Sequence, residues 1–231
     1  MKQKLLGLSL RFWRLFFLVC FVISLYFSYR ETPLTWVTGV EVFAVITGAV
    51  CVWLAIIEHI ANWFVAILSS VAYIVLFRHS RLYSDMGLQV VYVILGLWGW
   101  YNWLHGGRGH GELRVTRTPK REWLLLWLAG LFGTALLWRV NLFFNGAAPF
   151  WDACLTAFSL VAQYMITRKY IENWMLWILV DAIYVPLYLS RKLYPTAVLY
   201  ALFVGLAIMG WQEWRASYEK TALERGSIEP V

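Results

Sequence analysis

The sequence predicts an all-α integral membrane protein made of two parallel three-helix repeats, a linking helix between them and one extra N-terminal helix. Three observations support this prediction: an apolar composition, a succession of apolar runs and a gapless internal repeat. Of the 231 residues, 61% are hydrophobic and only 14% are charged. Soluble domains carry roughly 25% charged residues, so this composition is typical of a protein that lies in a lipid bilayer.

The chain contains eight apolar runs that we expect to form membrane-spanning helices. The first run, 12–29, follows a basic segment as in a signal peptide, but it lacks an A-x-A cleavage site, so we expect an uncleaved helix. Several runs are near or slightly below the roughly 20 residues that cross a bilayer, and 62–77 is the weakest candidate. The other runs are 36–57, 62–77, 87–104, 123–143, 149–167, 173–190 and 196–214.

The net charge of +7 is explained by membrane topology. Lys and Arg are concentrated in alternate connections between the apolar runs, and the positive-inside bias therefore predicts that both termini are cytoplasmic. No basic stripe or known binding motif accompanies the charge, so we expect no nucleic-acid partner.

A gapless internal repeat relates the two halves of the chain. A shift of 111 residues places 60–103 on 171–214, and the matches include polar-aromatic pairs that chance similarity between apolar runs rarely produces. The shared residues include Asn62-Trp63 with Asn173-Trp174, Tyr73 with Tyr184, Gly99-Trp100 with Gly210-Trp211, and Trp103 with Trp214.

The repeat determines the order of the predicted helices. Each copy holds three spans and ends on the side opposite to its start, so one further crossing, 123–143, must precede the second copy. The result is a 3+1+3 arrangement of parallel repeats, as in sugar transporters of the SWEET type, whose substrate sites lie near mid-membrane between the repeats. The predicted segments are an N-terminal helix in 1–35, the first repeat 36–104, a cytoplasmic loop and linker helix 105–148, the second repeat 149–214, and a charged cytoplasmic tail 215–231 that we expect to be frayed.

One face of the helix predicted over 173–190 is the main candidate for a binding site. Asn173, Trp177, Asp181, Tyr184 and Tyr188 follow one another at steps of four, four, three and four residues, so they share a helical face. A carboxylate, an amide and three aromatic rings are costly to expose to lipid, and they indicate a cavity lined by protein or water.

Further polar residues extend this candidate site. Thr156, Ser159 and Gln163 share a face of the helix predicted over 149–167, and Gln89 and Tyr92 begin a face of the helix predicted over 87–104. Aromatic rings can stack on a heteroaromatic ring and attract a positive one, while amides and a carboxylate can bind hydroxyl groups. The set therefore suits a flat, polar ligand, and that ligand can carry a positive charge.

Structural roles compete with each of these assignments. Hydroxyls and amides in membrane helices often only join helices, at roughly 0.6 kcal/mol each. Asn173 can be an N-cap of its helix instead of a ligand contact. Trp177 and the tyrosines can be plain packing residues, and Asp181 can pair with a neighbouring side chain.

Metal binding and catalysis are not suggested. The cysteines lie inside apolar runs without paired spacing, and the histidines form no HExxH pattern. The chain has no nucleophile elbow, phosphate loop or carboxylate pair with a histidine, so we expect neither an enzyme nor a cofactor.

Three aromatic-rich stretches are uncommon in combination. They read LYSDMGLQVVYVILGLWGWYNW, NWMLWILVDAIYVPLYLSRKLYPTAVLYALF and GWQEW. Over roughly 36–214 they resemble the PnuC family of bacterial vitamin-precursor transporters, which are similar to full-length SWEETs. The first helix and the tail lie outside this resemblance.

The resemblance implies a 3+1+3 fold, a homotrimer, and facilitated uptake of nicotinamide riboside across the bacterial inner membrane, with phosphorylation in the cytoplasm trapping the product. It implies that Asn173 and Trp177 contact the ligand, with Gln89 and Gln163 nearby. Similar relatives carry thiamine or riboflavin, so another vitamin or a sugar is an alternative ligand. A membrane-embedded enzyme, or a subunit that packs beside one, is the alternative from a different class.

Overall fold

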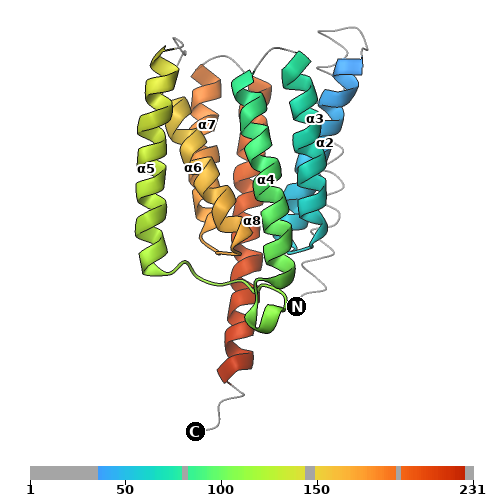
Figure 1. Ribbon diagram of the computed structural model, residues 1–231, viewed down its shortest axis with the longest axis vertical. Coiled ribbons are helices and arrows are strands. Elements are labelled where there is room, and N and C mark those ends of the chain that lie inside the picture. The colour runs from blue at the N-terminus through green and yellow to red at the C-terminus, as the bar shows by residue number, and fades with distance from the viewer. Residues whose placement is uncertain (1–35, 80–82, 144–148, 191–193, 227–231) are drawn as a thin grey trace. The chain divides into compact units, whose positions relative to one another are not determined.

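The computed structural model describes residues 36–79, 83–143, 149–190 and 194–226. This part of the chain forms seven α-helices and no β-strand, which confirms the all-α prediction (Figure 1). The N-terminal helix expected over 12–29 lies outside the described residues. The helices are α2 (Trp36–Ile56), α3 (Ala61–His79), α4 (Tyr83–His105), α5 (Lys120–Phe143), α6 (Pro149–Thr167), α7 (Asn173–Ser190) and α8 (Tyr194–Gly226), with a short 3-10 turn, η1 (Arg108–His110).

Proline marks the start of two helices in the second half of the chain. Pro119 directly precedes α5, and Pro149 is the first residue of α6. Proline lacks a backbone N–H group, and the N–H groups of the first helical turn have no partner inside the helix. Proline at the start of a helix therefore costs no hydrogen bond. The first turn of each helix also holds an acidic residue, Glu122 in α5 and Asp152 in α6. Their negative charges interact favourably with the positive end of the helix dipole.

Two of the described helices are long and apolar enough to cross a membrane by themselves, α3 and α5. The run 62–77, the weakest candidate from the sequence, is therefore part of a 19-residue helix. Shorter apolar stretches lie at Ile46–Ile56 and Asn173–Leu187. Large apolar side chains are exposed along α5, among them Phe132 at 72% and Phe143 at 80%, as expected for a helix in contact with lipid.

The prediction of a frayed tail is wrong for 215–226, and 227–231 lie outside the described residues. Helix α8 continues to Gly226 and runs on beyond the ends of α6 and α7 (Figure 1). Two ion pairs at i,i+4 spacing support this extension, Arg215–Glu219 at 2.9 Å and Lys220–Glu224 at 3.6 Å. Charged residues without apolar periodicity can thus form a solvated helix when opposite charges lie one turn apart.

The described chain divides into two compact units. The first holds the described residues up to Leu54 together with Ala61–Gly96, and the second holds Ala55–Ile60 and everything from Leu97 onward. In the first unit, Ser69 Oγ donates a hydrogen bond of 3.0 Å to the carbonyl oxygen of Ala44, which joins α3 to α2. A Cβ atom at Gly96 would lie 3.0 Å from the Ile67 side chain, so the small residue lets α4 approach α3 closely.

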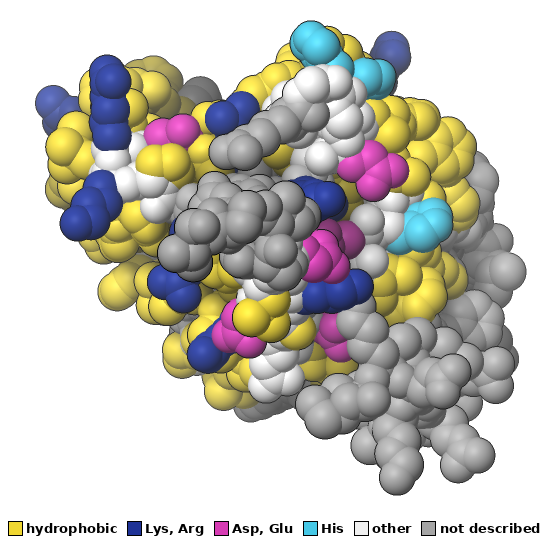
Figure 2. Space-filling view, turned by 90° about the horizontal axis from the view of Figure 1, so that it is seen from below, with side chains coloured by type: hydrophobic (Ala, Val, Ile, Leu, Met, Phe, Trp, Pro, Cys, Tyr) yellow, Lys and Arg dark blue, Asp and Glu magenta, His cyan; other side chains and the backbone are white. Residues whose placement is uncertain are grey.

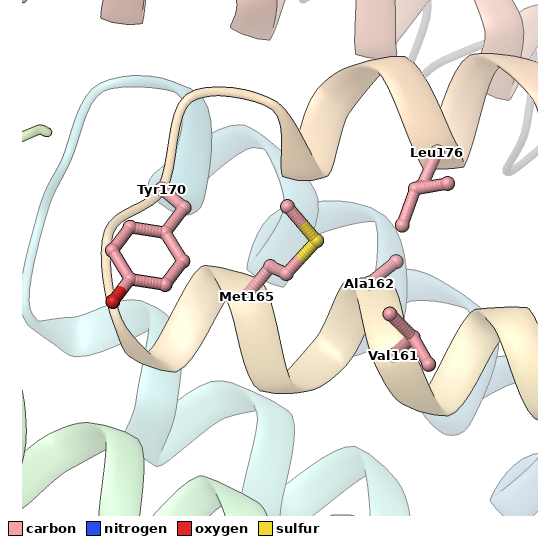
Figure 3. Packing of buried hydrophobic residues seen from close by; sticks show 5 residues of the cluster. All are labelled: Val161, Ala162, Met165, Tyr170 and Leu176. Carbon is pink, nitrogen blue, oxygen red and sulfur yellow. The ribbon is translucent and has the colours of Figure 1, made fainter. Parts of the chain in front are cut away.

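The core of the second unit lies where α6 packs against α7 and α5. Side chains from α6 project toward the segment that carries Tyr170 and Leu176 (Figure 3). Glycines bring other helices close, because a Cβ atom at Gly130 would lie 2.8 Å from the Phe158 ring. The buried cluster comprises Val161, Ala162, Met165, Tyr170 and Leu176.

Two tryptophans in the second unit make equivalent hydrogen bonds. Trp103 Nε1 donates to the carbonyl oxygen of Ile166, and Trp214 Nε1 donates to that of Ala55, each at 3.0 Å. Both the two tryptophans and the two acceptors are 111 residues apart, which is the offset of the sequence repeat. A two-fold relation between equivalent segments produces such reciprocal contacts.

The same offset relates Glu58 to Lys169. Both residues have a left-handed backbone, with φ of 56° and 51°, which is uncommon for residues other than glycine. Their side chains form an ion pair, with Lys169 Nζ 3.0 Å from Glu58 Oε2. The turn before α3 and the turn before α7 therefore share a backbone conformation and contact each other.

Candidate functional site

The face of α7 predicted as a binding site is turned inward. Asn173 is 0% exposed and Asp181 is 6% exposed, and Trp177 is half-buried against the core cluster. The side chain of Tyr188 lies outside the described residues. The opposite side of the helix carries the exposed positions Met175, Leu179, Ala182, Pro186 and Leu189.

Asn173 does not make the N-cap contact considered from the sequence. An N-cap side-chain oxygen accepts a bond from a backbone amide two or three residues later. Here the side-chain nitrogen donates instead, over 2.6 Å, to the carbonyl oxygen of Tyr170. The side-chain oxygen Oδ1 is buried and has no hydrogen-bond partner in the described part of the chain. The amide thus fixes the turn before α7 and leaves one acceptor unused.

Asp181 is a buried carboxylate in the middle of α7. No hydrogen bond or ion pair to it is formed by any residue within the described ranges. The pairing with a neighbour considered from the sequence is therefore not seen among these residues. Buried carboxylates in membrane helices are expensive and mark functional sites.

Tyr184 connects the inward face of α7 to α8. Its ring lies 4.6 Å from the ring of Tyr200, with the two planes tilted by 46°. Tyr200 occupies the position in the second half that corresponds to Gln89 in the first. The two halves therefore place different chemistry, an aromatic ring and an amide, at equivalent positions.

The three candidate residues on α6 lie in the same unit as α7. Ser159 is buried, whereas Thr156 and Gln163 are half-buried. Asp152, which shares their helical face, is exposed and accepts a hydrogen bond of 3.1 Å from Asn141 Nδ2. The carboxylate at this end of α6 is thus engaged with α5, and the inward part of the face begins at Thr156.

Gln89 and Tyr92 belong to the first unit. Both are half-buried on α4. The structure thus gathers the candidates on α6 and α7 in one unit and leaves these two in the other, so that only the first group can be described as one cluster.

Sequence reasoning missed a cavity in the second unit. Its volume is about 710 Å³, and Glu58 and Lys169 line it together with the loop after α4 and with Ser217 and Thr221 of α8. None of the predicted site residues lines this cavity. Viewed from below, acidic and basic side chains lie side by side on this face of the protein (Figure 2). The offset between Glu58 and Lys169 was the one signal in the sequence that could have drawn attention to it.

The loop between α4 and α5 is attached to the turn between α6 and α7. Thr116 donates its amide proton to the carbonyl oxygen of Lys169 and accepts one from Ile171, both at 3.0 Å. Glu172 Oε2 accepts bonds from both the amide and the hydroxyl of Thr118, at 2.9 and 2.8 Å. These contacts give the loop a fixed conformation at the wall of the cavity.

Tyr170 in the same turn reaches the start of α5. Its hydroxyl donates to Glu122 Oε2 over 2.7 Å. Burial, and secondarily this bond to a carboxylate, raises the pKa of Tyr170 above its ordinary value. The hydroxyl therefore keeps its proton, and the hydrogen bond, throughout the physiological range.

Comparison with known proteins identifies the family. A family model described as nicotinamide mononucleotide transporter matches residues 38–216. The nicotinamide riboside transporter PnuC of Escherichia coli (strain K12) is 30% identical over 221 residues, covering 84% of this chain and 89% of its own. The riboflavin/roseoflavin transporter RibM of Streptomyces davaonensis is 26% identical over 174 residues, covering 73% of this chain and 81% of its own.

A solved structure shares the fold. The crystal structure of the vitamin B3 transporter PnuC superimposes with a TM-score of 0.67 at 22% sequence identity, over 90% of this chain and 92% of the other. This likeness shows the fold, and the family model together with the 30% identical relative confirms the resemblance inferred from the aromatic-rich stretches. With a family model that matches most of its length, the chain belongs to the nicotinamide mononucleotide transporter family.

Proposed function

We propose that this protein carries nicotinamide riboside across the bacterial inner membrane by facilitated diffusion. The observation that carries the proposal is the buried carboxylate of Asp181 on the inward face of α7, one turn from the half-buried ring of Trp177 and paired with no residue of the described ranges. Nicotinamide riboside has a flat cationic ring and a ribose with free hydroxyls. An aromatic ring attracts such a cation, and a buried carboxylate is stabilised by a positive charge nearby.

The names of the relatives support this ligand class. Transporters from Escherichia coli and from Neisseria mucosa, 30% and 26% identical to this chain, are named for nicotinamide riboside. The polar candidates Thr156, Ser159 and Gln163 on α6 are suited to the ribose, because hydroxyls and amides can both donate and accept hydrogen bonds. Gln89 and Tyr92, which belong to the first unit, are proposed as further ligand contacts on the resemblance and on their half-buried positions on α4.

Riboflavin is the second candidate ligand, because a relative 26% identical over 174 residues is named a riboflavin/roseoflavin transporter. Riboflavin is also flat and carries hydroxyls, but its ring system is neutral at pH 7. A neutral ring gives the carboxylate of Asp181 no countercharge, so the buried acid favours the cationic vitamin.

The proposed architecture is a 3+1+3 arrangement of parallel repeats, 36–104 and 149–214, preceded by one N-terminal helix and linked by α5. The exchanged bonds of Trp103 and Trp214 support this arrangement, because they relate the two copies at the offset of the sequence repeat. Both termini are proposed to be cytoplasmic on the distribution of Lys and Arg. The exposed apolar surface of α5 is compatible with a homotrimer in the bilayer.

Facilitated diffusion only equalises the ligand concentration on the two sides of the membrane. Continued net uptake therefore requires that the ligand be removed from the cytoplasm. The proposal includes phosphorylation of the ligand in the cytoplasm by a separate enzyme, which keeps the inward gradient. The transporter itself is proposed to carry out no chemistry and to need no cofactor.

Calorimetric titration of the purified protein against nicotinamide riboside, thiamine, riboflavin and glucose tests the ligand. We expect binding of nicotinamide riboside, and uptake of the labelled compound by liposomes that contain this protein alone. Uptake of another ligand in its place, or none at all, would contradict the proposal.

Replacing Trp177 with Ala tests the site. Loss of a ring that faces a cation should weaken binding about tenfold, since such contacts contribute roughly 0.5–2 kcal/mol and a tenfold change corresponds to about 1.4 kcal/mol. Trp151→Ala is the matched control, because Trp151 is a tryptophan of α6 that is 48% exposed. Equal affinities of the two variants would show that Trp177 is only a packing residue.

A further inference from the structure

The cavity between the α4–α5 loop and α8 has the volume of a small-molecule site. Its volume of about 710 Å³ lies within the range of roughly 300–1,000 Å³ that small-molecule sites occupy. Charged groups of both signs line it, including Glu112 and Arg114 on the loop, as well as Glu58 and Lys169. A polar cavity of this size at the end of a helical bundle can hold a hydrated solute.

The pair Glu58–Lys169 is a short and largely buried ion pair in the cavity wall, with Lys169 Nζ 3.0 Å from Glu58 Oε2. Its side chains are 24% and 9% exposed, and Lys169 Nζ also lies 4.4 Å from the centre of the Trp103 ring. The other ion pair of a lining residue, Arg114–Glu224, spans 3.9 Å between side chains that are 58% and 50% exposed. Water screens such an exposed pair, whereas a largely buried pair is costly to break.

Tryptophan contacts reinforce the ion pair. Trp103 and Trp214 are 3% and 0% exposed, and their rings lie 6.0 Å apart. Through their hydrogen bonds to Ile166 and Ala55, they join the end of α6 to the end of α2. The ion pair thus connects the turn before α3 to the turn before α7, and the two indoles in contact with each other lie beside it.

We propose that the cavity is the cytoplasmic vestibule of the transport path and that the Glu58–Lys169 ion pair is the gate that closes its inner end. This inference rests on the proposed transport function. A solute that leaves through the vestibule must separate the two turns, and the ion pair is the charged contact that has to break. The contact between the Trp103 and Trp214 rings opens with it, because Trp103 is bonded to the end of α6 and Trp214 to the end of α2.

The loop after α4 moves with this gate. Its residue Thr116 is bonded to the backbone of Lys169 and Ile171 on either side of Tyr170, so displacement of the α6–α7 turn displaces the wall of the vestibule as well. Opening of the gate therefore unblocks the inner end of the vestibule and also widens the vestibule itself.

Charge exchange between the two positions provides a sharp test. Glu58→Gln and Lys169→Met each remove one charge while keeping most of the side-chain volume. The double variant Glu58→Lys/Lys169→Glu restores the pair in reverse. Both positions already hold a left-handed, non-glycine residue, so the exchange adds no new backbone strain.

The readout is the rate at which a hydrophilic maleimide labels a buried cysteine in the turn that carries Glu58, where the Ala55 carbonyl accepts the Glu58 amide at 3.1 Å. Ala55→Cys is suitable because Ala55 is 3% exposed and accepts the Trp214 bond through its backbone. The protein is used in lipid nanodiscs, with Cys20, Cys51 and Cys154 replaced by Ala. Ser217→Cys is the control, since Ser217 lines the vestibule outside the gate and should be labelled at one rate in all variants.

We expect labelling at position 55 to accelerate about tenfold in both single variants and to return to within about twofold of the parent rate in the double variant. Unchanged rates in the single variants, or a double variant as fast as the single ones, would overturn the gate. Titration with nicotinamide riboside is run on the same samples. If the parent fails to bind it while labelling still follows the charges, the proposed ligand is wrong and the gate is supported.

Discussion

Substitution of Gly210 by Ala should destabilise the protein through one contact. A Cβ atom at this position of α8 would lie 2.5–2.7 Å from three ring atoms of Trp174. Trp174 is 2% exposed and packs edge-on against Trp214 at 5.5 Å, so its ring has no free space into which it can move. Overpacking of this kind costs roughly 1–3 kcal/mol, against a gain of up to about 1 kcal/mol from replacing glycine within a helix.

The expected net loss is therefore about 1–2 kcal/mol. For a chain of this size, each kcal/mol shifts Tm by roughly 2–4 °C, so thermal unfolding in detergent should show a decrease of about 2–8 °C. Gly205→Ala is the matched control on the same helix, because nothing lies within 4 Å of its Cβ position. That variant should be as stable as the parent or slightly more stable.

A second substitution isolates the contact. In a Trp174→Phe background, the smaller ring leaves room for the added methyl group, and Gly210→Ala should cost less than it does beside the indole. The same background removes the indole Nε1, a buried donor without a partner in the described part of the chain. If Gly210→Ala is as stable as Gly205→Ala, or if its cost is the same in both backgrounds, the assigned clash is refuted.

Two further predictions concern charge and pH. Asp181→Asn should weaken binding of nicotinamide riboside about tenfold but leave binding of its reduced, uncharged dihydro form within about twofold, as measured by calorimetry; equal losses would contradict a countercharge role. Because the pKa of Tyr170 is raised from 10.0, its contribution to stability is complete below pH 10 and is lost as pH rises through its folded-state pKa. Tyr170→Phe should therefore reduce the loss of stability between neutral and strongly alkaline pH in thermal unfolding, and an unchanged pH profile would contradict this assignment.

The inward orientation of α7 could be predicted from the sequence because polar and aromatic residues recur at helical spacing. The spacing of Asn173, Trp177 and Asp181 defines a face regardless of what the neighbouring helices are. The exposed side with Met175 and Leu179 follows from the same periodicity. The bond that Asn173 makes could not be predicted, because it depends on the conformation of the preceding turn and not on its composition.

The repeat could be predicted, but not the contacts between its copies. Identity at one offset indicates that two segments have the same shape, yet Trp103 and Trp214 each bond to a carbonyl group, which carries no sequence signal. The extension of α8 was missed for a different reason. Apolar periodicity indicates a helix that packs or spans a membrane, whereas charge pairs one turn apart stabilise residues 215–226.

The ion pair of Glu58 and Lys169 distinguishes the two copies of the repeat. In a symmetric dimer of single three-helix proteins, each of these positions would meet its own copy, and any charge there would face an identical charge. An indole can face its own copy without such a penalty, as the equivalent residues Trp103 and Trp214 do. A complementary pair requires that the two copies differ at this position, as they do here with Glu58 in one and Lys169 in the other. The opposite charges at these two positions thus make the two copies non-equivalent: two copies that both carried Glu, or both carried Lys, would place like charges together here.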